Sequence, residues 1–239
     1  MLGFKRKYKL LESGILRGAT DIHCHVLPGV DDGSPDIDTS FQLLEFMSER
    51  IGYSKVWLTP HVMRDLHNTA EKVSAVFSTL KENYSGSVEL RLASEYMMDE
   101  GFKERLTTDP LRLGSEHLLV ETSYMNPPVR LDNILMSVWE AGFRPLIAHP
   151  ERYMYMGKKD YEHLKEYGFD FQLNIMSLSG YYGARPKAVA FKLLEQGMYD
   201  YVGSDLHHLD VYQPMMEKMK LTKSHLDALD ELLANNNYI

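Results

Sequence analysis

The chain has 239 residues, a formal net charge of −8, 44% hydrophobic residues and 25% charged residues. This composition is typical of a globular protein with a buried core, and the acidic balance argues against nucleic acid as a partner. The single cysteine excludes an intramolecular disulfide and favours a reducing cytoplasm. No apolar run reaches the roughly 18 residues that span a bilayer. We therefore expect a cytoplasmic protein that does not span a membrane.

Residues 1–18 are a basic lead-in with Lys5, Arg6, Lys7 and Lys9, but they lack the apolar block and cleavage site of a secretory signal. We expect this lead-in to pack on the outside of the domain, and a role in contacting a membrane surface or a partner has weak support. No linker, low-complexity segment or short repeat divides the chain. Residues 1–239 are therefore expected to form a single domain.

Seven strand–helix units alternate along the chain, which predicts a parallel α/β barrel. The helices follow from apolar stripes at helical spacing, and one of them is predicted to start with a capping box, Asn68-x-x-Glu71. The strands are expected at 20–25, 54–59, 88–95, 117–121, 144–148, 169–175 and 199–203. The helices are expected at 36–52, 68–80, 100–106, 131–142, 159–167, 187–196 and 224–234.

The end of the first strand carries His23 and His25. Side chains alternate along a strand, so these two imidazoles face one side and Cys24 faces the other. Two imidazoles at a strand end are poor core residues but good metal ligands. The following Pro-, Gly- and Asp-rich turn brings Asp31 and Asp32 back toward them. Taken alone, the segment is equally compatible with a polar strand end and a solvated acidic turn.

Each later strand also ends in a residue that a core disfavours. Active sites of parallel barrels lie at the C-terminal ends of the strands, so these residues are expected to converge. A capping or rim role explains any single one of them, but not the position that they share. They are His23, His25, His61, Glu95, Glu121, His149, Asn174, Asp205 and His207, with Asp32 from the first turn.

Imidazole and carboxylate ligands without a thiolate suit Mn, Fe or Zn better than Ca. The number of candidates exceeds what one ion coordinates, which favours two to three divalent metals. Such clusters generate a hydroxide at neutral pH and neutralise phosphoryl oxygens during in-line displacement. The predicted metal ligands are His23, His25, Asp32, His61, Glu95, Glu121, His149, Asp205 and His207.

These motifs resemble the PHP (polymerase and histidinol phosphatase) superfamily, and most closely its bacterial capsule-type, manganese-dependent protein-tyrosine phosphatases. The shared pieces occur in order over about residues 20–234. They are His-x-His, the Asp-Asp-Gly turn, Thr-Pro-His, Ser-Glu, the glutamate after the fourth strand, Ala-His-Pro-Glu-Arg-Tyr and Gly-Ser-Asp-x-His. The resemblance implies a distorted (β/α)7 TIM-like barrel with a trinuclear site at the C-terminal ends of the strands. Manganese is the favoured metal, with iron or zinc as alternatives.

The resemblance also implies how the ligands divide. One ion would take His23, His25, Glu95 and Asp205; a second would share Glu95 and add Glu121 and His149; a third would take Asp32, His61 and His207. We interpret Asp31, Glu151 and His208 as turn, supporting or rim residues.

The implied reaction is hydrolysis of a phosphomonoester by a metal-bridging hydroxide that attacks phosphorus in line, without a phosphoenzyme. The favoured substrate is phosphotyrosine on a protein, with a bacterial tyrosine kinase of capsule or exopolysaccharide synthesis as the favoured partner. The tyrosine phenol, with a pKa near 10, leaves more readily than a serine alkoxide. Arg152 is the favoured residue for binding phosphate. His207 is a candidate to assist the leaving oxygen.

The chain departs from the family pattern in one place. Relatives often carry a further arginine soon after Asp-x-His, where this chain reads Leu-Asp-Val-Tyr over 209–212. Arg185 and Arg64 are the candidates to replace it. A cysteine-based phosphatase is excluded, because the position at which that mechanism needs an arginine after Cys24 is occupied by Val30.

Two alternative functions stay open. The first is a phosphatase for a small metabolite such as histidinol phosphate or a sugar phosphate. The second is a non-catalytic, metal-bound regulatory partner of a tyrosine kinase. Loop tyrosines could stack on an aromatic substrate, although partial burial is the simpler account of them. These tyrosines are Tyr153, Tyr155, Tyr181 and Tyr182. The sequence does not indicate an oligomeric state.

Overall fold

The strands form two parallel sheets and one short antiparallel ribbon. The computed structural model describes residues 6–108 and 110–239. The smaller parallel sheet has the strand order β2-β3-β5, and the larger has the order β10-β9-β8-β7-β6-β4. The parallel strands are β2 (Thr20–Cys24), β3 (Lys55–Leu58), β4 (His61–Val62), β5 (Glu89–Leu92), β6 (Glu95–Met97), β7 (His117–Glu121), β8 (Arg144–Ala148), β9 (Asp170–Asn174) and β10 (Tyr201–Gly203).

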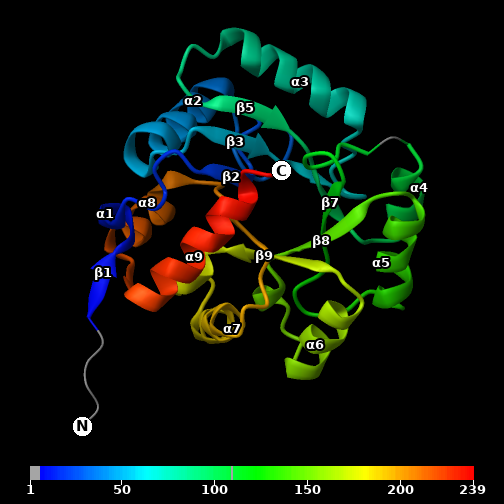
Figure 1. Ribbon diagram of the computed structural model, residues 1–239. Coiled ribbons are helices and arrows are strands. Elements are labelled where there is room, and N and C mark those ends of the chain that lie inside the picture. Colours follow the sequence, from blue (N-terminus) through cyan, green and yellow to red (C-terminus); the bar gives the residue numbers. More distant parts are fainter. Residues whose placement is uncertain (1–5, 109) are drawn as a thin grey trace.

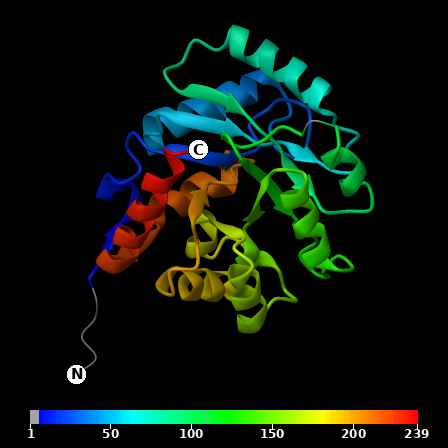
Figure 2. The same ribbon diagram turned by 45° about the vertical axis from the view of Figure 1, so that its right-hand side comes forward.

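The helices lie around the outside of the strands, as Figures 1 and 2 show. This arrangement follows when each helix buries one apolar face against a parallel sheet. In the described part of the chain, no helix is both long and apolar enough to cross a membrane. The α-helices are α1 (Leu10–Ser13), α2 (Ile37–Glu45), α3 (Ala70–Asn83), α4 (Phe102–Leu106), α5 (Leu131–Glu140), α6 (Lys158–Glu166), α7 (Ala184–Glu195), α8 (Leu209–Lys218) and α9 (Lys223–Asn236).

The two parallel sheets are joined at both of their meeting edges. On one side the chain itself joins them, because β3 leads into β4 and β5 into β6 across short breaks, where the amide of Glu95 donates to the carbonyl of Pro60 over 3.1 Å. On the other side, the amide of His25 donates to the carbonyl of Leu206 over 2.9 Å. The parallel sheet is therefore curled, and the C-terminal ends of its strands surround a common space.

Two apolar clusters fill this architecture. The larger one lies between the strands and the helices. The smaller one lies inside the curled sheet, where Leu146 and Ala148 of β8 point inward while Ile147 points out to the larger cluster. This alternation is the period of two that a strand imposes. Because the inner cluster is small, the space toward the C-terminal strand ends is left to polar side chains.

The predicted elements are largely confirmed. Each predicted strand region contains a strand, and the regions 117–121 and 144–148 coincide with β7 and β8. The helix predicted over 36–52 forms as α2 and continues as a π-helix, Phe46–Ile51, which ends at Gly52 with a φ of 95°. Asp36 caps α2, because its side chain accepts a hydrogen bond from the amide of Thr39.

The predicted capping box at the start of α3 is wrong. Thr69 is the N-cap, and its side chain accepts from the amide of Lys72. The Asn68 amide is buried instead and donates to the carbonyls of Val30 and His61, over 2.8 Å each. Asn68 therefore ties the first turn to the segment that carries His61.

Some ordered regions carry no predicted element. One is helix α8, whose interior Pro214 removes a backbone donor that a helix interior normally uses. Others are the short helix α1 and the ribbon in which β1 (Lys7–Lys9) pairs antiparallel with β11 (Lys220–Thr222). The ribbon lies at the periphery, as expected for the lead-in, but Leu10 is fully buried next to it. Residues 1–5, with Lys5, lie outside the described residues.

An ion cluster joins the starts of β7, β8 and β9, at the end of the sheet opposite the histidines. Arg144 binds both carboxylate oxygens of Asp170, and His117 lies 3.1 Å from one of them. Burial opposes ionisation of Asp170, but the hydrogen bonds from His117 and Arg144 outweigh it and lower the carboxyl pKa.

Asp170→Asn should therefore lower the free energy of unfolding at pH 7 by about 2 kcal/mol, less than a fully buried pair because Arg144 is partly exposed. A carboxyl with a lowered folded-state pKa stabilises above its unfolded pKa, and that stability is lost as the pH falls through the folded value. The difference in the free energy of unfolding between Asp170→Asn and wild type should therefore shrink below about pH 4. Urea unfolding at pH 7 and at pH 3 measures the loss of stability and its dependence on pH. Asp132→Asn, which removes an exposed pair with His163, is the control and should change little.

Candidate metal centre

The first strand end brings two histidines together as predicted. His23 and His25 are fully buried, and their Nε2 atoms lie 3.1 Å apart. Cys24 faces the opposite side, where its sulfur donates to the carbonyl of Trp57. A β-bulge interrupts the pairing of β2 with β3 between Asp21 and Cys24. Bulges commonly re-aim side chains beside active sites, and this one lies at the two imidazoles.

The turn after β2 packs closely against His25. A Cβ atom on Gly33 would lie 2.0 Å from the carbonyl oxygen of His25, so only glycine fits there. Asp31 accepts from the ring Nδ1 of His25 over 2.8 Å and from the amide of His61 over 3.0 Å. Asp31 therefore orients one candidate ligand and positions another, as a carboxylate behind a metal-binding histidine commonly does. Asp32 points outward, and its carboxylate lies 3.5 Å from both His61 and His207.

Glu95, at the start of β6, occupies the centre of the cluster. It is completely buried, and its Oε2 lies 3.0 to 3.4 Å from the nearest ring nitrogens of His23, His25 and His61. Its other oxygen, Oε1, lies 2.9 Å from Nε2 of His149. A single carboxylate thus contacts four imidazoles that come from three different strand ends.

The loops after β8 and β10 place His149 and Asp205 with backbone strain. Their φ angles are 35° and 51°, in the left-handed region that residues with a Cβ rarely adopt. Asp205 lies 3.5 Å from His23, 3.3 Å from His25 and 3.5 Å from His207. The ring of His207 stacks on that of His25 with centroids 3.9 Å apart. Strain of this kind persists where the surrounding contacts hold a functional residue in place.

All nine predicted ligands belong to four groups that share members. Within each group, the ligand atoms lie within 4.8 Å of one another. The groups differ in part from the division that the resemblance implies. Glu121 lies 2.9 Å from His61, and His149 joins a group with His23 and Asp205. The four groups are His25–Asp32–His61–His207, His23–His25–Glu95, His23–His149–Asp205 and His61–Glu95–Glu121.

The residues fit a cation, because several buried atoms of the cluster have no hydrogen-bond partner in the described structure. Nδ1 of His61 and Oε1 of Glu121 are 2.9 Å apart but lack hydrogen-bond geometry. Oε2 of Glu95 and Nδ1 of His149 are also without a hydrogen bond. Buried polar atoms are normally satisfied, so unsatisfied nitrogen and oxygen atoms that converge are what a metal site requires.

The charges of the cluster depend on one another. Burial opposes a charge on His61, as does nearby His25, but Glu95 and Glu121 outweigh both and raise the His61 pKa to about 10. Burial likewise opposes ionisation of Glu95, yet His23 and His61 hold its pKa well below the usual range. Without a cation, the carboxylates are therefore balanced by protons on the imidazoles. A bound metal would displace those protons.

Sequence reasoning missed two residues that hold the ligands. Oε1 of Gln172, on β9, lies 3.1 Å from Nδ1 of His23 and accepts from the backbone amide of His149. Asp21 is a buried carboxylate that accepts from both the amide and the hydroxyl of Ser204, just before Asp205. Gln172 could have been found from the sequence, because it precedes Asn174 by two residues and therefore faces the same side of the strand. No sequence pattern indicates the role of Asp21, because its partner Ser204 is distant in sequence.

Arg152 reaches the same site from the short 3-10 turn Pro150–Arg152. Its Nη1 donates to Asp205 over 2.7 Å, and its guanidinium lies between two tyrosine rings. The guanidinium carbon is 4.2 Å from the ring centroid of Tyr124 and 3.9 Å from that of Tyr182. Tyr182 and Asn174 also bind Asp205, over 3.1 Å and 2.6 Å. Tyr182 therefore has a defined role beyond the partial burial expected for it.

The remaining residues that the sequence singled out each have defined contacts in the structure. Glu151 is buried and accepts from the hydroxyls of Ser177 and Tyr199, a supporting role as interpreted. The two arginines considered as replacements for the missing one have other partners. Arg64 pairs with Glu100 over 3.0 Å, and Arg185 contacts the sulfur and carbonyl of methionines in the loop before α6.

The fold and the site together define a class, an α/β protein with a buried imidazole–carboxylate cluster at the C-terminal ends of parallel strands. Residues 19–237 match the family model for capsular polysaccharide synthesis proteins, CpsB/CapC. The chain belongs to this family.

Named relatives and solved structures agree with this membership. The chain is 28% identical to the tyrosine-protein phosphatase YwqE of Bacillus subtilis, over 79% of this chain and 77% of that protein. It is 30% identical to the tyrosine-protein phosphatase CpsB of Streptococcus pneumoniae, over 83% and 86%. A crystal structure from work on these two proteins, described as unique metal-dependent tyrosine phosphatases, superposes with a TM-score of 0.76 and 26% identity. It covers 90% of this chain and 94% of that one.

A more distant structure shares the fold alone. The inactive dihydroorotase-like domain of a CAD-like protein from Chaetomium thermophilum superposes with a TM-score of 0.50 at 14% identity.

If the cluster binds metal, affinity should fall as the pH drops from 8 to 6, because the imidazoles must lose their protons before they coordinate. Glu95→Gln should weaken binding of Mn²⁺ by more than about 100-fold, since it removes the carboxylate that contacts four of the imidazoles. Titration calorimetry and elemental analysis after dialysis measure both effects. Glu100→Gln, at an exposed site, is the control. Unchanged metal content in Glu95→Gln would contradict the assignment of the site.

Proposed function

We propose that this protein is a metal-dependent protein-tyrosine phosphatase that acts in capsular or exopolysaccharide synthesis. The observation that carries the proposal is the convergence of nine imidazole and carboxylate side chains at one end of the strands, in a chain of the CpsB/CapC family. Relatives of this family are named tyrosine-protein phosphatases. The reaction is addition of water to phosphorus and cleavage of the phosphorus–oxygen bond to tyrosine, which yields inorganic phosphate and the free phenol.

We propose further that the two sheets belong to one distorted (β/α)7 barrel of the PHP type, in a single domain. The bridge between Cys24 and Leu206 places β2 beside the segment that follows β10. The strand order of the larger sheet then leads from β10 through β7 to β6 and β4. The family match over 19–237 supports one domain rather than two.

The proposed ligands would hold two to three divalent ions, with manganese favoured and iron or zinc as alternatives. When bound, such ions lower the pKa of a coordinated water and neutralise phosphoryl oxygens. Glu95 would be a central ligand of these ions, since it contacts four imidazoles. Asp31 and Gln172 hold His25 and His23 in the orientation that coordination needs.

Arg152 is the proposed phosphate-binding residue. Burial opposes its charge, but Asp205 and the neighbouring tyrosines raise the pKa of the guanidinium further, so it is charged throughout the physiological range. The rings of Tyr124 and Tyr182 pack against the guanidinium, 4.2 Å and 3.9 Å from its carbon, and restrict its movement. A fixed planar fork matches two oxygens of a phosphate.

The chain itself offers no cysteine nucleophile. Burial raises the pKa of the Cys24 thiol well above its usual value, and the sulfur faces away from the histidines. The proposed reaction therefore passes through no covalent phosphoenzyme. His207 is the candidate to assist the leaving phenol, because its side chain is 21% exposed at the rim of the cluster.

A phosphotyrosine protein is the proposed substrate, and a bacterial tyrosine kinase is the proposed source of it. The cytoplasmic location inferred from composition belongs to the same proposal. The rival activity is hydrolysis of a small phosphorylated metabolite on the same metal chemistry.

The direct test is to load the protein with Mn²⁺ and compare hydrolysis of a phosphotyrosine peptide with that of histidinol phosphate, measured as released phosphate. We expect turnover of the peptide, dependence on added metal and loss of activity in His25→Ala. Metal binding without turnover of either compound would sink the enzyme hypothesis. Turnover of histidinol phosphate alone would sink the protein-phosphatase assignment.

Arg152→Lys should lower kcat/KM for phosphotyrosine peptides by about 10- to 100-fold, because lysine keeps the charge but loses the planar fork. Metal content should be unchanged, since arginine is not a ligand. Arg185→Lys, in the neighbouring loop, is the matched control and should stay close to wild type. Equal activity of the two variants would remove Arg152 from the phosphate site.

A further inference from the structure

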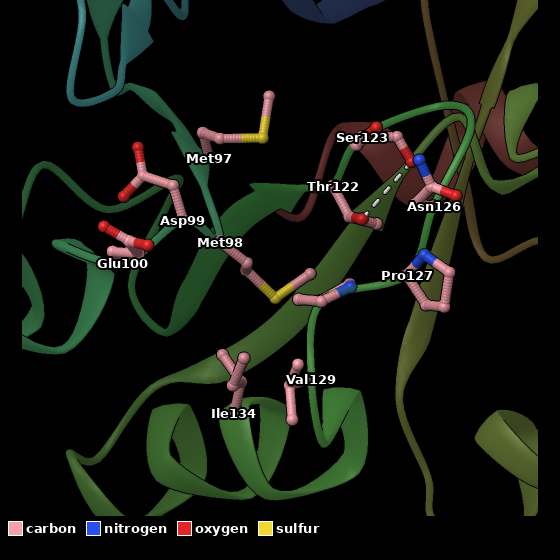
Figure 3. A pocket seen from close by; sticks show the side chains of 11 residues that line it. Met97, Met98, Asp99, Glu100, Thr122, Ser123, Asn126, Pro127, Val129 and Ile134 are labelled. Carbon is pink, nitrogen blue, oxygen red and sulfur yellow. Dashed lines mark hydrogen bonds between the residues drawn. The ribbon is translucent and has the colours of Figure 1, made fainter.

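A groove of about 450 Å³ lies beside the candidate metal centre, between the ends of β6 and β7 and the start of α5. In Figure 3, Thr122, Ser123 and Asn126 lie toward one side of the groove and Asp99 and Glu100 toward the other, while Met98 lies in the middle with Val129 and Ile134 below it. The apolar lining is formed by Met97, Met98, Pro127, Pro128, Val129 and Ile134.

The groove is adjacent to the metal centre along β6 and β7. Met97 is the register partner of Glu121, a proposed ligand, and the amide of Met98 donates to the Glu121 carbonyl over 2.9 Å. Met97 follows Glu95 by two residues, so the alternation of a strand directs both side chains to the same face. Thr122, which lines the groove, comes directly after Glu121. The groove therefore begins within one residue of the proposed ligands.

The acidic residues at one end of the groove already have partners. Arg105 binds Asp99, and Arg64 binds Glu100 over 3.0 Å. Their charges are therefore balanced within the chain, and the groove has no unmet need for a cation. An uncharged apolar side chain is the occupant that suits its lining.

The loop between β7 and α5 exposes apolar side chains at the same place. Val129 is 88% exposed and Met125 is 67% exposed. The same loop carries Tyr124, whose ring packs on Arg152. One loop thus joins the proposed phosphate-binding arginine to the groove. An extended polypeptide spans about 3.3–3.6 Å per residue, so residues near a phosphotyrosine can contact the groove while the phosphate contacts the arginine.

We propose that this groove binds an apolar side chain of the substrate protein, within a few residues of the phosphotyrosine. The inference rests on the proposed function and deepens it, because it makes the enzyme selective for sequence around the phosphorylated tyrosine. The groove and the metal centre act on one polypeptide, which lies across the loop that carries Tyr124.

The test uses the Mn²⁺-loaded protein and phosphotyrosine peptides of one sequence, in which leucine or aspartate is placed in turn at each of the three positions on either side of the phosphotyrosine. At one or more positions, leucine should raise kcat/KM about tenfold over aspartate, as burial of an aliphatic side chain predicts. Val129→Asp should abolish this preference and leave hydrolysis of free phosphotyrosine within about twofold of wild type. Val129 is too exposed for its replacement to disturb the core.

Met136→Asp is the control, since Met136 is exposed on α5 but does not line the groove. It should keep the leucine preference. A wild-type enzyme without the preference, or a Val129→Asp variant that retains it, overturns the inference while activity on free phosphotyrosine preserves the proposed function. Inactivity toward every phosphotyrosine compound overturns the proposed function itself. A wild-type dimer that Val129→Asp dissociates would assign the groove to a second copy of the chain, against the inference.

Discussion

The contact between the buried carboxylate of Glu95 and four imidazoles is the interaction on which the site depends. A carboxylate in a dry interior is costly unless opposite charge or a cation lies beside it. Here the neighbouring histidines supply that charge as protons, and the same atoms are the natural ligands for divalent ions. If the centre binds metal as proposed, it has two electrically balanced states, one protonated and one metal-bound, and exchange between them would couple metal affinity to pH.

The curled sheet makes this contact possible. The four histidines lie at the ends of β2, β3 and β8, and no single segment of the chain could bring all of them within reach of the Glu95 carboxylate. Close packing at two glycines allows the approach: a Cβ on Gly33 would strike His25, and one on Gly203 would lie 2.6 Å from the Cβ of His23. The positive φ angles of His149 and Asp205 show the strain that these turns carry. Tertiary contacts hold it in place.

Around this centre, the loops after β7, β8 and β9 bring aromatic and basic side chains together. Tyr124 and Tyr182 pack on the guanidinium of Arg152, and Tyr182 also binds Asp205, so the proposed phosphate-binding group and a proposed ligand share a partner. Arg64 and Arg185, the other arginines considered for phosphate, have other partners. Arg152 is therefore the one guanidinium that we propose for phosphate, and the apolar groove beyond Tyr124 is the proposed binding place for a neighbouring side chain of the substrate.

The sequence by itself determined most of the strands and helices, though not α8, β1 or β11, and the nine candidate ligands, because period-two and helical apolar patterns and polar strand ends are local signals. The sequence also predicted that Cys24 faces away from His23 and His25. Only the tertiary structure decided the contacts between distant segments, such as the partners of Asp21, Gln172 and Asn68 and the pairing of β1 with β11. It likewise grouped Glu121 with His61 rather than with His149. These depend on how seven strand ends meet in space, which no local pattern encodes.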